Sequence, residues 1–171
     1  MLFRSIVDNR AGGGTVIATE LVARAPADAH TLLINFNSFT INPAVRPKLP
    51  YDTVRDFAGV ARIATTPMIF AVHPSLPVKT FRELLALAKA KPGQLTYATP
   101  GAGTGQHLAG EMLRTMTGID IVHLPYQGAA PAVTAALGGH TSILLMNVSD
   151  VVPHSSVGRL RPLAEIGRAH V

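Results

Sequence analysis

The sequence contains no cysteine and no tryptophan among its 171 residues. Without cysteine there is no disulfide framework, and thiolate chemistry and thiolate metal sites are excluded. Aromatic residues make up only 5% of the chain. No apolar run approaches the roughly 20 residues that a membrane-spanning helix needs. We therefore expect no membrane insertion.

Charged residues are also few, at 15% of the chain, and the formal net charge is +5. Lys and Arg are scattered along the sequence, whereas a nucleic-acid surface would show them clustered beside aromatic residues. We therefore expect no nucleic-acid partner. We interpret the positive net charge as that of a solvated surface, which has at most a mild preference for anions. The 47% of apolar residues is ample for a buried core.

Glycine and proline interrupt the chain at short intervals, and the segments between them alternate in type. Runs rich in Val, Ile, Leu and Phe predict strands over residues 31–36, 57–65, 68–73, 95–98, 119–124, 142–146 and from 161. Amphipathic runs predict helices over residues 16–25, 81–91, 106–117, 131–137 and 150–157. Residues 41–50 are expected to be irregular. Strands that alternate with helices indicate an α/β fold with a largely parallel sheet.

The clearest helix begins after Thr80, which is a favourable N-cap residue. Glu83 follows three residues later, as in a capping box. Pro92 and Gly93 end the helix, and Lys89 and Lys91 lie in its last turn, where positive charge favours the helix dipole.

Two segments have the order strand, glycine-rich turn, helix: residues 8–15 and residues 99–107. Glycines allow the backbone to approach a ligand closely. The free N–H groups of the following helix start favour an anion. The hydroxyls of Thr99 and Thr104 add possible donors at the second segment. The pattern predicts an anion site there, although a tight turn that merely requires positive φ is the alternative.

The sequence matches the motifs of nucleotide-binding and catalytic sites poorly. Gly101, Gly103 and Gly105 resemble a dinucleotide fingerprint, but Gln106 stands where the third glycine is required, and the lysine of a phosphate loop is missing. No histidine has metal-site spacing, and no serine lies in a nucleophile elbow. We expect no metal, no cofactor and no catalytic residue. His107 and His123 are candidate donors to an anion, or residues that simply pack.

Several blocks of this sequence, taken in order, resemble the Bug family, the substrate-binding proteins of tripartite tricarboxylate transporters. The first is Val7-Asp8-Asn9-Arg10-Ala11-Gly12-Gly13-Gly14, which is similar to a glycine-rich stretch of that family. The others are residues 41–43, 49–52 with 56–57, 72–77, 88–95, 108–111, 122–128 and 158–161. The resemblance covers residues 6–164.

The resemblance implies a type II periplasmic-binding-protein-like fold, with two α/β lobes that contain largely parallel sheets. Residues 6–76 would form part of lobe one, and residues 77–164 would form lobe two. It also implies a periplasmic protein that is not an enzyme. Its ligand would be a small carboxylate, and its partners would be the membrane permease subunits of the transporter.

The resemblance further implies a set of ligand-binding residues. Residues 101–106 would hold the proximal carboxylate, with Thr104 as the hydroxyl donor. Residues from both lobes would complete the site. The full set is Asn37, Ser38, Thr99, Gly101, Gly103, Thr104, Gly105, Gln106, Tyr126, Gly128 and Asn147.

The two ends of the chain do not fit the family pattern. Residues 1–5 and 165–171 read like translated sequencing-adapter DNA, so we expect both ends to be non-native. The first strand and the C-terminal portion of the family have no counterpart, which makes this a truncated fragment with an incomplete first lobe. Two other functions stay open: a cytoplasmic α/β enzyme that binds phosphate at the Gly101–Gly105 loop, and a sensor input module of the same fold.

Overall fold

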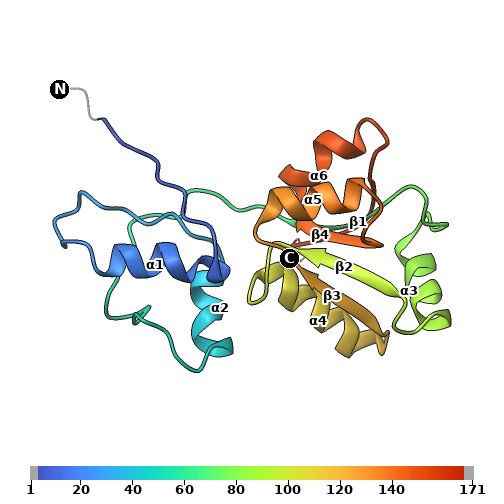
Figure 1. The fold of residues 1–171 in the computed structure, drawn as a ribbon, viewed down its shortest axis with the longest axis horizontal. Coiled ribbons are helices and arrows are strands. Elements are labelled where there is room, and N and C mark those ends of the chain that lie inside the picture. The colour runs from blue at the N-terminus through green and yellow to red at the C-terminus, as the bar shows by residue number, and fades with distance from the viewer. Residues whose placement is uncertain (1–3, 168–171) are drawn as a thin grey trace. The chain divides into compact units, whose positions relative to one another are not determined.

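The computed structural model describes residues 4–167 (Figure 1). The chain divides after Ala58 into two compact units, and each is described here by itself. We call residues up to Ala58 unit 1 and the residues from Gly59 onward unit 2. None of the helices in the described range has the length and apolarity to cross a bilayer.

Unit 1 contains short helical segments joined by a polar network. The segments are η1 (Gly13–Thr15), α1 (Val16–Ala23) and α2 (Ser38–Val45). The Asn35 side-chain amide donates to Thr15 Oγ1 at 3.2 Å and to Thr19 Oγ1 at 3.0 Å. The fully buried Asn42 donates to Gly14 O at 2.9 Å. These contacts join η1, α1 and α2 and provide partners for the buried side chains of Thr19 and Asn42.

Three of the predicted elements in the N-terminal part of the chain were wrong. Residues 31–36 and 57–65 are not strands, and residues 38–45 form a helix where irregular backbone was expected. Leu32, Ile34 and Phe36 are exposed. A strand exists only when neighbouring strands complete its hydrogen bonds, and no strand lies among the described residues of unit 1. Pro43 removes only one bond from α2, so the helix persists around it.

Unit 2 is built on a five-stranded sheet of order β3-β2-β4-β1-β5. Its strands are β1 (Met68–Val72), β2 (Leu95–Thr99), β3 (Ile121–Pro125), β4 (Ile143–Asn147) and β5 (Arg161–Ile166). β2 is parallel to both β3 and β4, whereas β1 is antiparallel to β4 and β5. The α/β class with a parallel-rich sheet is confirmed, and β1 and β5 make the sheet mixed.

Four helices cover the two faces of this sheet (Figure 1). They are α3 (Phe81–Ala90), α4 (Gly105–Thr117), α5 (Ala129–Leu137) and α6 (Val148–Ser155). Residues 144 and 145 point to opposite faces, since Leu145 packs in a core cluster with residues of α3, and Leu144 packs in a second cluster with residues of α5 and α6. The alternation along each strand therefore produces two cores.

The division between the compact units falls before β1, because Met68–Val72 pairs along its whole length with β4 and β5. The lobe boundary at residue 76 stays a prediction. β5 also continues past residue 164, because Glu165 and Ile166 pair with Ile69 and Met68.

The cap of α3 forms as the sequence predicts. Thr80 Oγ1 accepts from the Glu83 backbone N–H at 3.2 Å. The Glu83 carboxylate accepts from the backbone N–H of Lys79 at 2.6 Å, one residue earlier than in the standard capping box. This hydrogen bond is the main reason why the pKa of Glu83 lies below its ordinary value.

Candidate ligand-binding site

Three parallel strands of unit 2 end at one edge of the sheet, and a helix begins soon after each. β2 ends at Thr99, β3 at Pro125 and β4 at Asn147. The helices α4, α5 and α6 follow them directly in the chain. The free N–H groups and positive dipole ends of helices gather at such an edge, which is where ligands bind in open α/β sheets.

The loop between β2 and α4 requires glycine at two positions. Gly101 has φ of 150° and Gly103 has φ of 80°, where side chains are disfavoured. A Cβ atom on Gly101 would also lie 3.3 Å from the Tyr126 carbonyl oxygen. The loops after β2 and β3 are joined by backbone bonds from Tyr126 N to Thr99 O at 3.0 Å and from Gly128 N to Pro100 O at 2.9 Å. Tyr126 and Gly128 therefore lie beside the glycine loop.

Thr104 caps α4, and its hydroxyl both accepts and donates a hydrogen bond. Its hydroxyl accepts from His107 N at 3.3 Å and donates to Gly101 O at 2.8 Å. A hydroxyl carries one proton. The hydroxyl proton of Thr104 is therefore used in the hydrogen bond to Gly101 O, and Thr104 contributes to the site by holding Gly101.

The backbone amides of the loop divide into two groups. Gly101 N donates to Thr99 Oγ1 and Gly103 N donates to His107 Nδ1, both at 3.3 Å. For the N–H groups of Ala102, Thr104, Gly105 and Gln106, the described residues provide no acceptor. Of these four residues, Gly105 and Gln106 are buried, and a buried N–H group calls for a partner. The amides of Gly105 and Gln106 are therefore candidate donors to an anion.

The side chains of Gln106 and Asn147 meet across the same edge. Gln106 Nε2 donates to Asn147 Oδ1 at 3.0 Å, and Gln106 is 7% exposed. Asn147 precedes α6, and its side chain makes no cap hydrogen bond to that helix. The contact joins the start of α4 to the end of β4, so Asn147 lies with the loop residues.

The two candidate residues of unit 1 are placed differently. Asn37 precedes α2 and is exposed. Ser38 is 3% exposed, accepts from Thr15 Oγ1 at 3.2 Å and donates to Asn35 Oδ1 at 3.3 Å. Within unit 1, Ser38 therefore belongs to the polar network, and only Asn37 presents an exposed side chain.

The electrostatics of the sheet edge favour a negative ligand. The first turns of α4 and α5 contain no acidic residue, so the positive ends of these helix dipoles are not neutralised there. α6 carries Asp150 in its first turn, and burial raises the pKa of that carboxyl above its ordinary value. No group of His, Asp or Glu within residues 4–167 could hold a metal ion.

One contact of the loop was not predicted. His123 Nε2 lies 2.7 Å from Thr99 Oγ1, and the two residues come from neighbouring parallel strands. The sequence analysis names His123 as a candidate donor to an anion or as a packing residue, without this contact. The strand register that pairs Tyr97 with His123 is the signal that would have placed it, and register is not readable from one strand alone.

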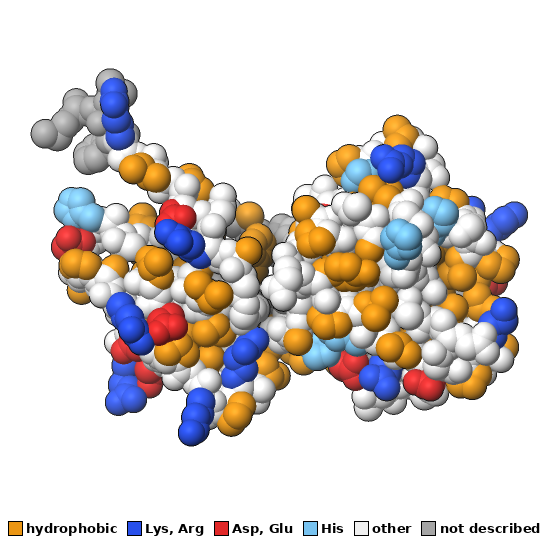
Figure 2. All heavy atoms as spheres, viewed as in Figure 1, with side chains coloured by type: hydrophobic (Ala, Val, Ile, Leu, Met, Phe, Trp, Pro, Cys, Tyr) orange, Lys and Arg blue, Asp and Glu red, His pale blue; other side chains and the backbone are white. Residues whose placement is uncertain are grey.

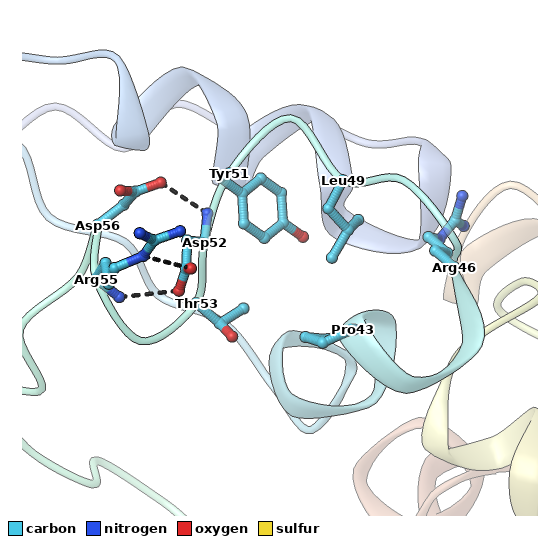
Figure 3. A pocket seen from close by; sticks show the side chains of 8 residues that line it. All are labelled: Pro43, Arg46, Leu49, Tyr51, Asp52, Thr53, Arg55 and Asp56. Atoms are coloured by element: carbon cyan, nitrogen blue, oxygen red, sulfur yellow. Dashed lines mark hydrogen bonds and ion pairs between the residues drawn. The ribbon is translucent and has the colours of Figure 1, made fainter.

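A hollow of about 540 Å³ lies in unit 1, where Tyr51 points into the space between the 51–56 segment and α2 (Figure 3). The Tyr51 hydroxyl is buried and has no hydrogen-bond partner within residues 4–167. The arginines of the hollow are engaged, since Arg46 donates to Asn42 and Gly13 and Arg55 pairs with Asp52 at 2.7 Å. The hollow lacks a free cation, which leaves the sheet edge as the better anion site.

The molecular surface is also consistent with an anion site formed by amides rather than by a basic patch. On the face drawn in Figure 2, Lys and Arg side chains lie singly, among acidic and apolar ones.

Comparison with known proteins adds independent information. A family model described as "Tripartite tricarboxylate transporter family receptor" matches residues 3–170. The protein BugT of Bordetella pertussis is 34% identical over 161 residues, which is 93% of this chain and 49% of BugT. A UPF0065 protein of Pseudomonas sp. (strain P51) is 35% identical over 158 residues, or 92% of this chain and 47% of that protein. The chain spans about half the length of the curated relatives that it matches.

Solved structures agree with this match. The structure titled "R. palustris Rpa4515 with adipate" has a TM-score of 0.91 and 34% identity, covering 94% of this chain and 54% of that one. The periplasmic binding protein BugD has a TM-score of 0.90 and 25% identity, covering 97% of this chain and 56% of that one. The fold of this chain is therefore that of about half of a periplasmic binding protein.

Proposed function

The chain belongs to the tripartite tricarboxylate transporter receptor family, and from this premise we propose that it captures a small carboxylate in the periplasm and delivers it to a membrane permease. The whole receptor would be about twice as long as this chain, in keeping with the share of each relative that the chain covers. Binding involves no chemical step, so we expect saturable affinity without turnover.

The observation that carries the proposal is the pair of amides at the start of α4. Gly105 N and Gln106 N have no acceptor in the described chain, and they lie where α4 begins beyond the carboxyl end of β2. A ligand carboxylate would accept from both and would also meet the positive end of the helix dipole. Each such charge-assisted bond is worth about 1.5–3 kcal/mol.

The chemical class of the ligand is supported by one related structure. Rpa4515 is described with adipate, a flexible dicarboxylate, and shares 34% identity with this chain. We propose that unit 2 presents a wall to such a ligand, made of Thr99, Gly101, Gly103, Thr104, Gly105, Gln106, Tyr126, Gly128 and Asn147. Of the two predicted residues of unit 1, the exposed Asn37 remains a proposed ligand contact.

Position 105 allows this proposal to be tested at a single amide. Proline is tolerated as the first residue of a helix, where it removes only an N–H group that the helix does not use. The residue before proline must be extended, and Thr104 already has φ of −84° and ψ of 161°. Gly105→Pro therefore deletes one donor, while Gly105→Ala keeps the donor and adds a comparable Cβ atom.

We expect isothermal titration of the full-length receptor to show binding of adipate and no binding of its neutral diamide. Gly105→Ala should bind adipate nearly as the wild type does, and Gly105→Pro should bind it about tenfold to a hundredfold more weakly. Equal affinity of the two variants, or an absence of binding to adipate, succinate and citrate alike, would refute the proposal. Inorganic phosphate in the same panel tests the alternative of an enzyme with a phosphate loop.

A further inference from the structure

Three aromatic rings lie behind the glycine loop, on the side of the sheet that α4 covers. The His123 ring stacks on the Tyr97 ring, with centroids 4.8 Å apart and an angle of 27° between their planes. It also stacks on the His107 ring, at 4.2 Å and 19°. β2 and β3 place Tyr97 and His123 in register, and α4 supplies His107. Two histidines are therefore packed face to face directly behind the loop.

The hydrogen bonds around Thr99 assign a role to one nitrogen of His123. Thr99 Oγ1 accepts from Gly101 N at 3.3 Å, so its single proton is left to donate. Gly101 O lies 3.3 Å from Thr99 Oγ1 and already accepts from Thr104 at 2.8 Å. His123 Nε2 is closer, at 2.7 Å. Of the two acceptors, His123 Nε2 is the nearer, so we assign the Thr99 proton to it and leave this nitrogen unprotonated.

His107 makes the matching contact at the other end of the loop. Its Nδ1 accepts from Gly103 N at 3.3 Å, so the ring proton of the neutral form is on Nε2. The charged groups that face this pair come from α4 and the segment after it. Glu111 Oε1 lies 3.9 Å from His107 Nε2, and Arg114 pairs with Glu111 at 2.8 Å and lies 4.0 Å from Asp120. The Tyr97 hydroxyl donates to Glu111.

We infer that His123 is a positioning residue for the carboxylate loop: as an uncharged acceptor it orients the Thr99 hydroxyl, which holds the amide of Gly101, while His107 holds the amide of Gly103. The amides of Gly101 and Gly103 are thereby bonded within the loop, and the buried amides of Gly105 and Gln106 remain for the ligand. This inference rests on the proposed carboxylate-binding function.

Protonation of His123 or His107 would change these hydrogen bonds. A protonated His123 would donate from Nε2 to Thr99 Oγ1 and could not accept the Thr99 proton, which would then turn toward Gly101 O. Two charged imidazoles at 4.2 Å would also repel each other. Burial, with the neighbouring His107 ring as the next cause, lowers the pKa of His123 to about 4, which keeps the ring an acceptor at neutral pH.

Matched variants of the full-length receptor distinguish the effect of the Nε2 acceptor of His123 from the effect of stacking by its ring. His123→Phe keeps a flat ring for stacking and removes the Nε2 atom, whereas His123→Gln places an amide oxygen near the same point. We expect His123→Phe to weaken adipate binding about tenfold and His123→Gln to recover most of that loss. Thr99→Val should resemble His123→Phe, and Thr99→Ser, which keeps the hydroxyl, should recover most of the loss. His140 is exposed, so His140→Phe serves as the control for general effects of replacing histidine with phenylalanine.

A spectroscopic readout tests the hydrogen bond independently of affinity. Imidazole ¹⁵N chemical shifts should show that Nε2 of His123 is unprotonated in the folded protein at pH 7, and a melting curve should show that His123→Phe is folded. If the wild type binds adipate and His123→Phe binds it equally well, or if Nε2 carries the proton, the inference is overturned while the proposed function stands. If the wild type binds no carboxylate, the proposed function fails first, and this inference fails with it.

Discussion

His123 is a residue whose ionisation the fold opposes. Burial lowers its pKa from 6.5 to about 4, and the nearby His107 adds to the effect. The imidazole of the unfolded chain takes up a proton as the pH falls below 6.5, while the folded ring stays neutral until about pH 4. Between these values the unfolded state binds more protons than the folded state. The free energy of unfolding therefore falls as the pH drops through this window, and the ring has no such effect above it.

We expect the free energy of unfolding of the wild type to fall more steeply between pH 6.5 and 4.5 than that of His123→Phe. The difference should be on the order of 1 kcal/mol, because solvent screening reduces the effect of a partly exposed ring. Urea titrations at several pH values would measure it. The comparison removes the effects of the carboxylates, which are present in both proteins, and parallel pH profiles would contradict the assignment.

Gly110 is a helical glycine that close packing requires. A Cβ atom at this position would lie 2.7 Å from Tyr97 Cζ. Tyr97 is fully buried, and its hydroxyl is bonded to Glu111, so the ring has no room to withdraw. Replacement of glycine by alanine in an exposed helix usually stabilises by up to about 1 kcal/mol. Gly110→Ala should instead destabilise by about 1–3 kcal/mol.

The urea midpoint would measure this effect, with Met116→Ala as a control on the same helix. Met116 is 79% exposed, so its truncation should change stability by no more than about 0.5 kcal/mol. A stabilising Gly110→Ala would mean that α4 does not approach Tyr97 this closely.

At the scale of elements, the N-caps of α3 and α4 use the same chemistry for different purposes. Thr80 and Thr104 each accept from the backbone N–H three residues later. Thr104 also donates to Gly101 O, in the loop that would hold the ligand. Thr80→Ala and Thr104→Ala should each cost about 1 kcal/mol of stability. Only Thr104→Ala should also weaken adipate binding, and Thr104→Ser should restore it.

Denaturation curves and titrations of both variants would test this difference. If Thr80→Ala weakened binding as much as Thr104→Ala did, the effect on affinity would come from general loss of stability and not from the loop.

The helices of unit 2 could be predicted because their signals are local. Thr80 and Thr104 begin α3 and α4, and Gly118 ends α4 with φ of 67°. Strands carry no such complete signal. Residues 31–36 have as strong a strand composition as residues 143–147, but only the latter lie between β2 and β1. The difference depends on neighbours that are distant in sequence, and composition does not describe them.

The same distinction applies to the candidate site. The glycine loop and its helix start were predicted, because the order of strand, glycines and helix is contiguous in the sequence. The bonds from Thr99 to His123 and from Gln106 to Asn147 were not predicted, since each joins residues of different strands or helices. Sequence reasoning therefore located the glycine loop and its helix start, and it named Thr99, Gln106 and Asn147 without the contacts that join them to other strands and helices.

At the scale of the whole molecule, the two units differ in what protects their backbone hydrogen bonds. In unit 2, β1, β2 and β4 each have a strand on both sides, and two core clusters cover the two faces of the sheet. The described part of unit 1 has three short helical segments, while Leu32, Ile34 and Phe36 remain exposed. Slow hydrogen exchange requires buried bonds that open only with the core, so it should concentrate in unit 2.

Hydrogen–deuterium exchange of this chain, followed by mass spectrometry of peptides, should show strong protection in residues 68–72, 95–99 and 143–147. Peptides from residues 4–36 should exchange faster by orders of magnitude, because local opening there breaks few apolar contacts. β3, at the edge of the sheet, provides an internal reference, since it pairs on one side only and should show intermediate protection. Equal protection in the two units would mean that unit 1 has a core of its own that its exposed apolar residues do not indicate.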